Sequence, residues 1–245
     1  YYLLMNKRIL LLLSIALSLC VSSFAINEKP FTIPEVKEWK GLDGSIALSG
    51  RIIYKGLEEK KVAQQLADDY QQLFGKQLTL VQDKARKGDI VLRLKAEKAL
   101  GEEGYTMSIH DTPILSANHR KGLYWATRTL LQLLEQHPSH ALPRGEIRDT
   151  PDYPFRGVML DCGRKYFPMS MLRQYVKMLA YYKMNVFHIH LNDNAFQWFY
   201  NNDWSRTPAA FRLESEWFPG LTARDGHYTK HDFIALQQLA DSLGI

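Results

Sequence analysis

The stretch from Arg156 to Asp193, RGVMLDCGRKYFPMSMLRQYVKMLAYYKMNVFHIHLND, decides which fold we expect for this chain. Arg156–Asp161 is apolar enough to predict a short buried strand. Met169–Lys183 has the apolar spacing of an amphipathic helix, and Asn185–Leu191 predicts a second strand. A strand, a helix and a second strand in this order predict a parallel sheet or the opening of a (β/α)8 barrel.

The residues that follow continue this alternation after a long loop. Thr229–Leu243 predicts a third helix, with Thr229 as its N-cap and Asp232 in its first turn. Gly244-Ile245 is typical of the entry to a third strand. We therefore expect residues 151–245 to form the first part of a (β/α)8 TIM barrel, truncated at about strand 3.

Residues 26–150 predict a small α/β domain that precedes the barrel. Helical spacing is found in Leu57–Phe74, which Gly75 ends, and in Lys121–Gln136. The expected strands are Ser45–Tyr54, Gln77–Val81, Asp89–Leu94, Tyr105–His110 and Ile114–Ala117. Three prolines predict a linker to the barrel: Pro143, Pro151 and Pro154.

Residues 1–25 predict a secretory signal, so we expect an exported protein in the periplasm or outside the cell. Lys7 and Arg8 precede the apolar run Ile9–Leu19, and Ser23–Ala25 offers small residues to a signal peptidase. The apolar run is too short to span a membrane. A lipoprotein anchor at Cys20 is the alternative.

Composition sets broad limits on the partners. The net charge of +5 falls to +3 without residues 1–25, and the basic residues are scattered, which argues against a nucleic-acid partner. Aromatic residues make up 12% of the chain, which suits sugar binding and a large core alike. Only Cys162 remains after signal removal, so no internal disulfide is expected.

Polar side chains follow both predicted barrel strands, where the active site of a parallel barrel lies. The guanidinium of Arg164 suits two sugar hydroxyls or a carboxylate, although a surface ion pair fits equally well. Asp193 could be a base, a metal ligand or a cap. His188 and His190 share one face of a strand, which favours either a metal-dependent barrel hydrolase or inward histidines with hydrogen-bonded neighbours. Cys162 is interpreted as a buried small residue rather than a nucleophile.

The same stretch resembles the opening of the catalytic barrel of glycoside hydrolase family 20, the β-N-acetylhexosaminidase family. The resemblance rests on the RG-x-MLD strand, the D-x-x-R-x-x-F-P turn, the YKMN helix end and the F-H-x-H-L strand. Gly122–Leu134, GLYWATRTLLQLL, is similar to the last helix of the small domain before that barrel. Together these similarities extend over nearly all of the chain after residue 25.

This resemblance implies an exo-acting enzyme that removes terminal β-linked N-acetylhexosamine from glycans. The 2-acetamido group of the substrate is the nucleophile, so no cofactor and no metal are implied. The family's catalytic Asp-Glu pair ends the fourth barrel strand and is therefore expected beyond Ile245. Glu102-Glu103 and Asp68-Asp69 lie in the small domain, so neither is that pair.

The resemblance also implies roles for single residues. Arg164 would hold hydroxyls of the terminal sugar, Asp193 would belong to a relay that orients the catalytic acid, and His190 would support that wall. Arg156 and Asp161 would be structural, at the base and in the wall of the barrel.

Part of the loop departs from the family pattern. Asn194–Trp198 replaces the usual Asp and Gln-Gly-Trp turn, and the segment from Phe211 to Glu216 resembles a Bacteroidetes-like subgroup. Arg212, Glu214 and Trp217 are expected at the pocket rim. These departures leave open a lacto-N-biosidase specificity, and a non-catalytic glycan-binding remnant remains the non-enzymatic alternative.

Overall fold

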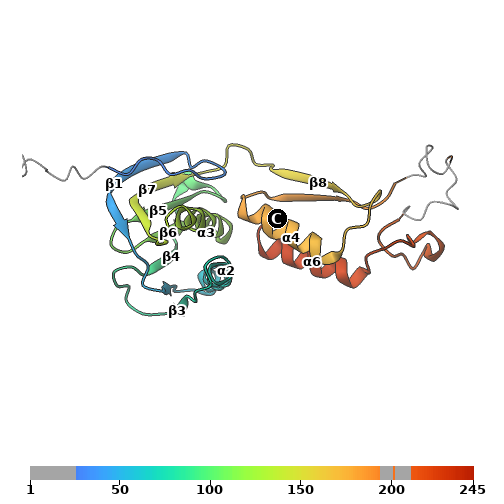
Figure 1. Ribbon diagram of the computed structural model, residues 1–245, viewed down its shortest axis with the longest axis horizontal. Helices are drawn as coiled ribbons and strands as arrows, with labels where there is room; N and C mark the ends of the chain where they lie inside the picture. The colour runs from blue at the N-terminus through green and yellow to red at the C-terminus, as the bar shows by residue number, and fades with distance from the viewer. Residues whose placement is uncertain (1–25, 194–200, 202–210) are drawn as a thin grey trace, which may run out of the picture.

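A computed structural model describes residues 26–193, 201 and 211–245 of the chain (Figure 1). The expected signal at 1–25 and the Asn194–Trp198 turn lie outside the described residues. The described chain forms a seven-stranded sheet with two helices, followed by two parallel strands with two further helices (Figure 1).

The first part is a mixed sheet with the strand order β1-β7-β5-β6-β4-β2-β3. Strands β2, β3, β4 and β6 are parallel, while β1, β5 and β7 pair in antiparallel fashion. The strands are β1 (Glu38–Ile46), β2 (Arg51–Ile53), β3 (Thr79–Val81), β4 (Ile90–Leu94), β5 (Tyr105–Ile109), β6 (Ile114–Ala117) and β7 (Leu142–Asp149). A short 3-10 helix, η1 (Lys98–Leu100), precedes β5.

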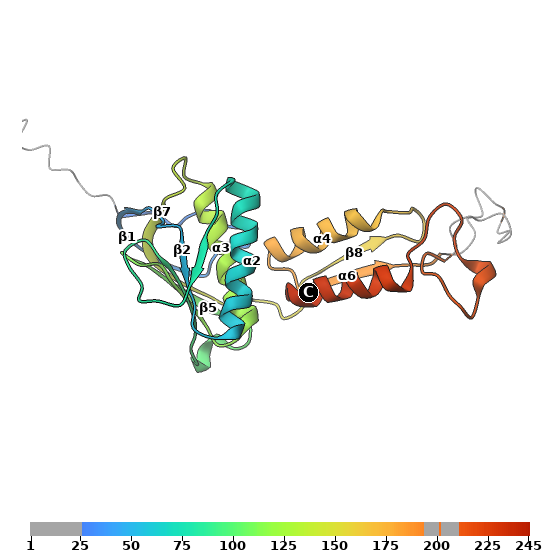
Figure 2. The same cartoon turned by 90° about the horizontal axis from the view of Figure 1, so that it is seen from below.

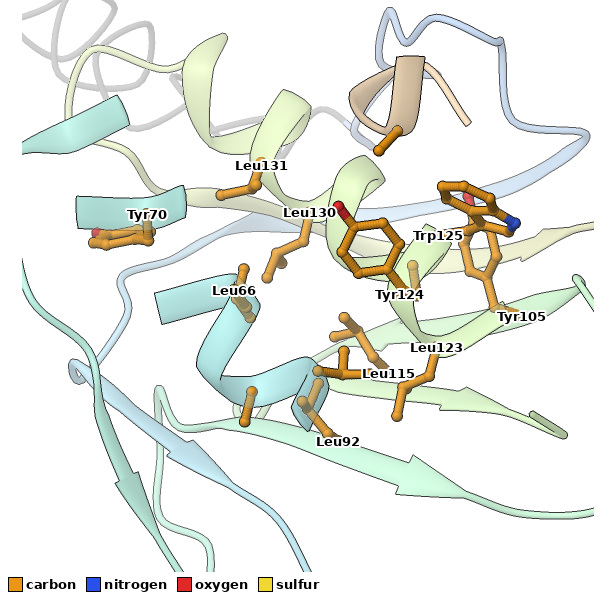
Figure 3. Close-up of a cluster of buried hydrophobic side chains, with 14 of the residues drawn as sticks. Leu66, Tyr70, Leu92, Tyr105, Leu115, Leu123, Tyr124, Trp125, Leu130 and Leu131 are labelled. Atoms are coloured by element: carbon orange, nitrogen blue, oxygen red, sulfur yellow. The ribbon is translucent and has the colours of Figure 1, made fainter. Parts of the chain in front are cut away.

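Two helices, α2 (Leu57–Phe74) and α3 (Arg120–Glu135), cover the face of this sheet that is turned toward the second part (Figure 2). Both were predicted to within one residue, and Gly75 ends α2 in the left-handed conformation as expected. Apolar side chains of both helices meet those of the sheet in one core, which includes Leu66, Leu92, Leu115, Leu123 and Leu130 (Figure 3).

Two predictions for this domain were wrong. Ser45–Tyr54 is not one strand, because β1 ends at Ile46 and the chain turns at Gly50, which has a φ of 88°. It then enters β2, which lies between β4 and β3 in the other half of the sheet. Pro143 is not in a linker but in β7, opposite Ser45 of β1. Proline is tolerated near the start of a strand, where its missing N–H costs little.

The second part repeats the predicted order of strand and helix. Its elements are β8 (Gly157–Asp161), α4 (Met169–Tyr181), β9 (Val186–His190), the 3-10 helix η3 (Pro219–Leu221) and α6 (Lys230–Ser242). β8 and β9 pair in parallel, from Gly157 opposite Val186 to Asp161 opposite His190. α4 and α6 lie side by side against one face of this pair, as at the start of a (β/α)8 barrel (Figures 1 and 2).

Both ends of α6 have defined structures. Thr229 is its N-cap, since its hydroxyl accepts a hydrogen bond from the N–H of Asp232 at 3.1 Å, as predicted. At the other end, Gly244 turns with a φ of 81° and the N–H of Ile245 donates to the carbonyl of Ala240 at 2.9 Å. Gly244 therefore ends the helix, and the strand entry expected at Gly244-Ile245 stays a prediction.

Candidate active site

The carboxyl ends of β8 and β9 bring three charged residues together. Nε of Arg164 lies 2.5 Å from Oδ2 of Asp193 and 3.4 Å from Oδ2 of Asp161. The N–H of Arg164 also donates to Oδ1 of Asp161 at 3.0 Å. Asp193 is largely buried, whereas 63% of the Arg164 side chain is exposed. The hydrogen bond and the charge of Asp193 raise the pKa of Arg164 above its usual value. This arrangement holds a cationic donor group at the strand ends, where hydroxyls or a carboxylate could bind.

Gly163 allows the two strand ends to come this close. The N–H groups of Cys162 and Gly163 both donate to the carbonyl of His190 at 2.9 Å. A Cβ atom on Gly163 would lie 2.9 Å from the carbonyl carbon of Asn192 and 3.2 Å from the nitrogen of Asp193. Gly163 was not among the predicted site residues, and its one signal in the sequence is its place directly after a predicted strand.

Replacing Gly163 with alanine is therefore expected to separate the two strand ends and lower kcat/KM by about 10- to 100-fold, since small misplacements of binding groups have large effects. Steady-state kinetics checks this. Gly220→Ala is the control, because that glycine lies at the same end of the molecule and its Cβ would meet nothing within 4 Å. Equal activities of the two variants would contradict the assigned role of Gly163.

Arg212 was predicted at the pocket rim, but it does not lie at an exposed position. It is fully buried, and its guanidinium donates to the carbonyls of Cys162 and Gly226, each at 2.7 Å, and pairs with Asp225. The Cζ atom of Arg212 lies over the aromatic ring of Tyr166, 5.8 Å from the ring centroid. Arg212 thus fastens the 211–228 segment to the turn after β8, and its burial keeps it away from a ligand.

The other two predicted rim residues are exposed. Oε1 of Glu214 accepts a hydrogen bond from the N–H of Lys230 at 2.9 Å, at the start of α6. Trp217 is 88% exposed and Phe218 is 64% exposed, both next to η3. The loop backbone is connected to the strand end, because Asn192 pairs with Phe211. The structure therefore leaves Trp217 available at this end of the molecule.

The histidines share one face of β9, as predicted. The side chains of Phe187 and Ile189 pack against the core, so His188 and His190 lie on the opposite face of β9. Among the described residues neither ring has a hydrogen-bond partner. No group of three or more His, Cys, Asp or Glu side chains suited to a metal ion occurs in that part of the chain either.

Cys162 is the buried small residue that the sequence predicted. It is fully buried, and burial raises the pKa of its thiol above the usual value. A thiol with a raised pKa is a poor nucleophile.

The comparisons with known proteins agree with this arrangement. The model of glycosyl hydrolase family 20, domain 2, matches residues 29–150, and that of the glycosyl hydrolase family 20 catalytic domain matches residues 153–245. The chain belongs to glycosyl hydrolase family 20. Over the stretches described above, none of the helices in this family 20 chain has the length and the apolar character that a bilayer crossing needs.

Relatives of the family 20 chain carry hexosaminidase names. A beta-hexosaminidase of Vibrio furnissii is 40% identical over 108 residues, which are 43% of this chain and 17% of that protein. The alpha subunit of beta-hexosaminidase from Mus musculus is 33% identical over 152 residues, which are 58% of this chain and 26% of that protein.

A solved structure shares the fold. The N-acetyl-beta-hexosaminidase of Streptomyces plicatus in complex with Thio-NAglucal superposes with a TM-score of 0.75 at 24% identity, over 90% of this chain and 45% of that chain. The family 20 chain thus spans less than half the length of each of these three proteins.

Proposed function

We propose that the protein is an exo-acting β-N-acetylhexosaminidase, which removes terminal β-linked N-acetylglucosamine or N-acetylgalactosamine from glycans. The observation that carries this proposal is the Arg164–Asp193 pair at the carboxyl ends of β8 and β9, in a chain whose two parts both match family 20. Sugar-binding groups of a barrel enzyme belong at this end of the strands.

The family's chemistry is substrate-assisted, an exception to the usual scheme with two enzyme carboxylates at the reacting carbon. The 2-acetamido oxygen attacks the anomeric carbon, an Asp stabilises the acetamido group, and the adjacent Glu protonates the leaving oxygen and later activates water. In this chain Arg164 would hold sugar hydroxyls, while Asp193 would orient both Arg164 and the catalytic acid. No described residue is assigned a bond-breaking role.

Two finer features belong to the same proposal. Export is supported by the basic residues, the apolar run and the small residues within 1–25. Membership of the Bacteroidetes-like subgroup is supported by the segment from Phe211 to Glu216, and exposed Trp217 would shape the pocket mouth.

The test uses the protein expressed from its native gene and a pair of aryl glycosides. Release of the aryl group from the β-N-acetylglucosaminide is expected, with at least a 100-fold lower rate on the β-glucoside, which lacks the acetamido nucleophile. Equal rates would contradict substrate assistance. Release of an intact disaccharide from a lacto-N-biose glycoside would instead indicate lacto-N-biosidase specificity, and loss of activity with a chelator would favour a metal hydrolase.

A further inference from the structure

Glu103 joins the small domain to the first barrel strands. Its side chain is only 12% exposed, and four donors reach its carboxylate. Oε1 lies 2.9 Å from Nζ of Lys121 and 3.2 Å from Nδ2 of Asn185. Oε2 accepts from Nε1 of Trp125 at 3.1 Å and from the guanidinium of Arg156. Each carboxylate oxygen thus has two donors, which leaves little freedom of movement.

Two of these donors lie at the amino ends of the barrel strands. Arg156 directly precedes β8, and Asn185 directly precedes β9. The two are also bonded to each other, since the N–H of Arg156 donates to Oδ1 of Asn185 at 2.8 Å. A single carboxylate of the small domain therefore holds the amino ends of both strands.

A second carboxylate reinforces the junction. Oδ2 of Asp149 accepts from Oη of Tyr105 at 2.7 Å and from Nζ of Lys183 at 3.1 Å. Lys183 has a left-handed φ of 58°, and its carbonyl accepts a hydrogen bond from Nε of Arg156 at 2.8 Å. Asp149 ends β7, so the sheet of the small domain is tied to the turn that leads into β9.

Charge and burial make these contacts hard to replace. Burial raises the pKa of the Glu103 carboxyl, but the hydrogen bonds and charges of Lys121 and Arg156 outweigh burial and hold the pKa below its usual value. Glu103 is therefore a carboxylate at neutral pH. Removing one partner from a buried ion pair leaves the other charge uncompensated, which is far more costly than losing an exposed pair.

β8 and β9 run from the junction to the candidate site, so a displacement of their amino ends also moves their carboxyl ends. From Arg156 to Asp161 the chain runs straight along β8 for roughly 16 Å at the usual rise of a strand. β8 and β9 pair along their whole length, so both strands move together. A shift at their amino ends then reaches Arg164 and Asp193, and a misplacement of about 1 Å can cost roughly 100-fold in rate.

We propose that Glu103 is a positioning residue of the active site: by holding Arg156 and Asn185, it sets where β8 and β9 place the Arg164–Asp193 pair. The small domain thereby has a part in the reaction. This inference deepens the proposed function and rests on it for its kinetic readout.

The experiment compares Glu103→Gln with Leu92→Ala in the protein expressed from its native gene. Glutamine keeps the shape of the side chain but removes its charge. Leu92 lies in the core on β4, away from the junction, so its truncation lowers the melting temperature without touching the strand ends. At a temperature where both variants are fully folded, Glu103→Gln is expected to lose about tenfold in kcat/KM. Leu92→Ala is expected to keep the wild-type value.

A double variant tests whether Glu103 acts through Arg164. Adding Glu103→Gln to Arg164→Ala is expected to cost less than about twofold further, because the group that it positions is already gone. Full additivity of the two losses, or a wild-type kcat/KM for folded Glu103→Gln, would overturn the inference.

Amide hydrogen exchange gives a readout that needs no activity. The N–H groups of Cys162 and Gly163 are bonded to the carbonyl of His190 across the strand ends. Their exchange is expected to accelerate in Glu103→Gln and not in Leu92→Ala. If the wild type does not hydrolyse the hexosaminide but this difference appears, the proposed function fails while the positioning role stands. Equal exchange in the two variants would overturn the positioning role.

Discussion

Replacing Arg164 with alanine is expected to lower kcat/KM on an aryl β-N-acetylglucosaminide by roughly 30- to 1000-fold. Charged hydrogen bonds to sugar hydroxyls that strengthen in the transition state are worth about 2 to 4 kcal/mol together, which corresponds to that range. Stability should hardly change, because the side chain is 63% exposed and exposed ion pairs contribute little. Steady-state kinetics and a thermal melt of the same preparations measure both effects.

Arg173→Ala is the matched control for this prediction. Arg173 is an exposed arginine on α4, one of the two helices that cover the outer face of the β8–β9 pair (Figure 2). The Arg173→Ala substitution removes the same positive charge as Arg164→Ala, so a general electrostatic effect on substrate binding would appear in both variants. Near-equal losses would rule out a sugar-binding role for Arg164.

The largest effect on stability is expected for Arg212→Ala. The guanidinium is fully buried and donates to two backbone carbonyls as well as to Asp225. Truncation leaves the carbonyls of Cys162 and Gly226 without these donors and Asp225 without its partner. Asp225 is 41% exposed and can be solvated, so the cost comes mainly from the two carbonyls, at about 1 to 3 kcal/mol each. The melting temperature should therefore fall by roughly 4 to 24 °C.

Differential scanning calorimetry of the protein expressed from its native gene measures this shift. Arg224→Ala is the control, since Arg224 is an exposed arginine in the same segment and its loss should change stability by less than about 0.5 kcal/mol. If Arg212→Ala melted with the control, the guanidinium would not be what fastens the 211–228 segment.

Local signals in the sequence were enough to predict several helices and strands. Leu57–Phe74 has an apolar face and a terminal glycine, and its bounds were predicted without error. Ile114–Ala117 was also predicted correctly, and β8 and β9 were predicted to within one residue at each end. These elements contain the pattern that defines them within a few residues, so no distant contact is needed to recognise them.

Strands that depend on a distant partner were predicted less well. β7 contains Pro143 and was interpreted as a linker, and most of β1 (Glu38–Ile46) was not predicted at all. Charged residues and glycines interrupt the apolar pattern of both strands, and the two strands pair with each other across about 100 residues of chain. Such a pairing leaves little trace in the local composition.

The sequence by itself determined which residues could form the candidate site. Arg164 and Asp193 were chosen because each follows a predicted parallel strand, and the carboxyl ends of such strands meet at one edge of the sheet. Their spacing along the chain could not show that the two side chains are in contact. The tertiary structure decided that, together with the close approach of Gly163 to Asn192.

Only the tertiary structure decided what surrounds the charged residues. Arg212 and Glu103 look like ordinary surface residues in the sequence, yet the first is fully buried and the second is held by four donors. The physical reason is that burial and charge pairing depend on which distant segments pack together. A charged side chain needs a partner when it is buried, but the sequence does not show which partner the fold supplies.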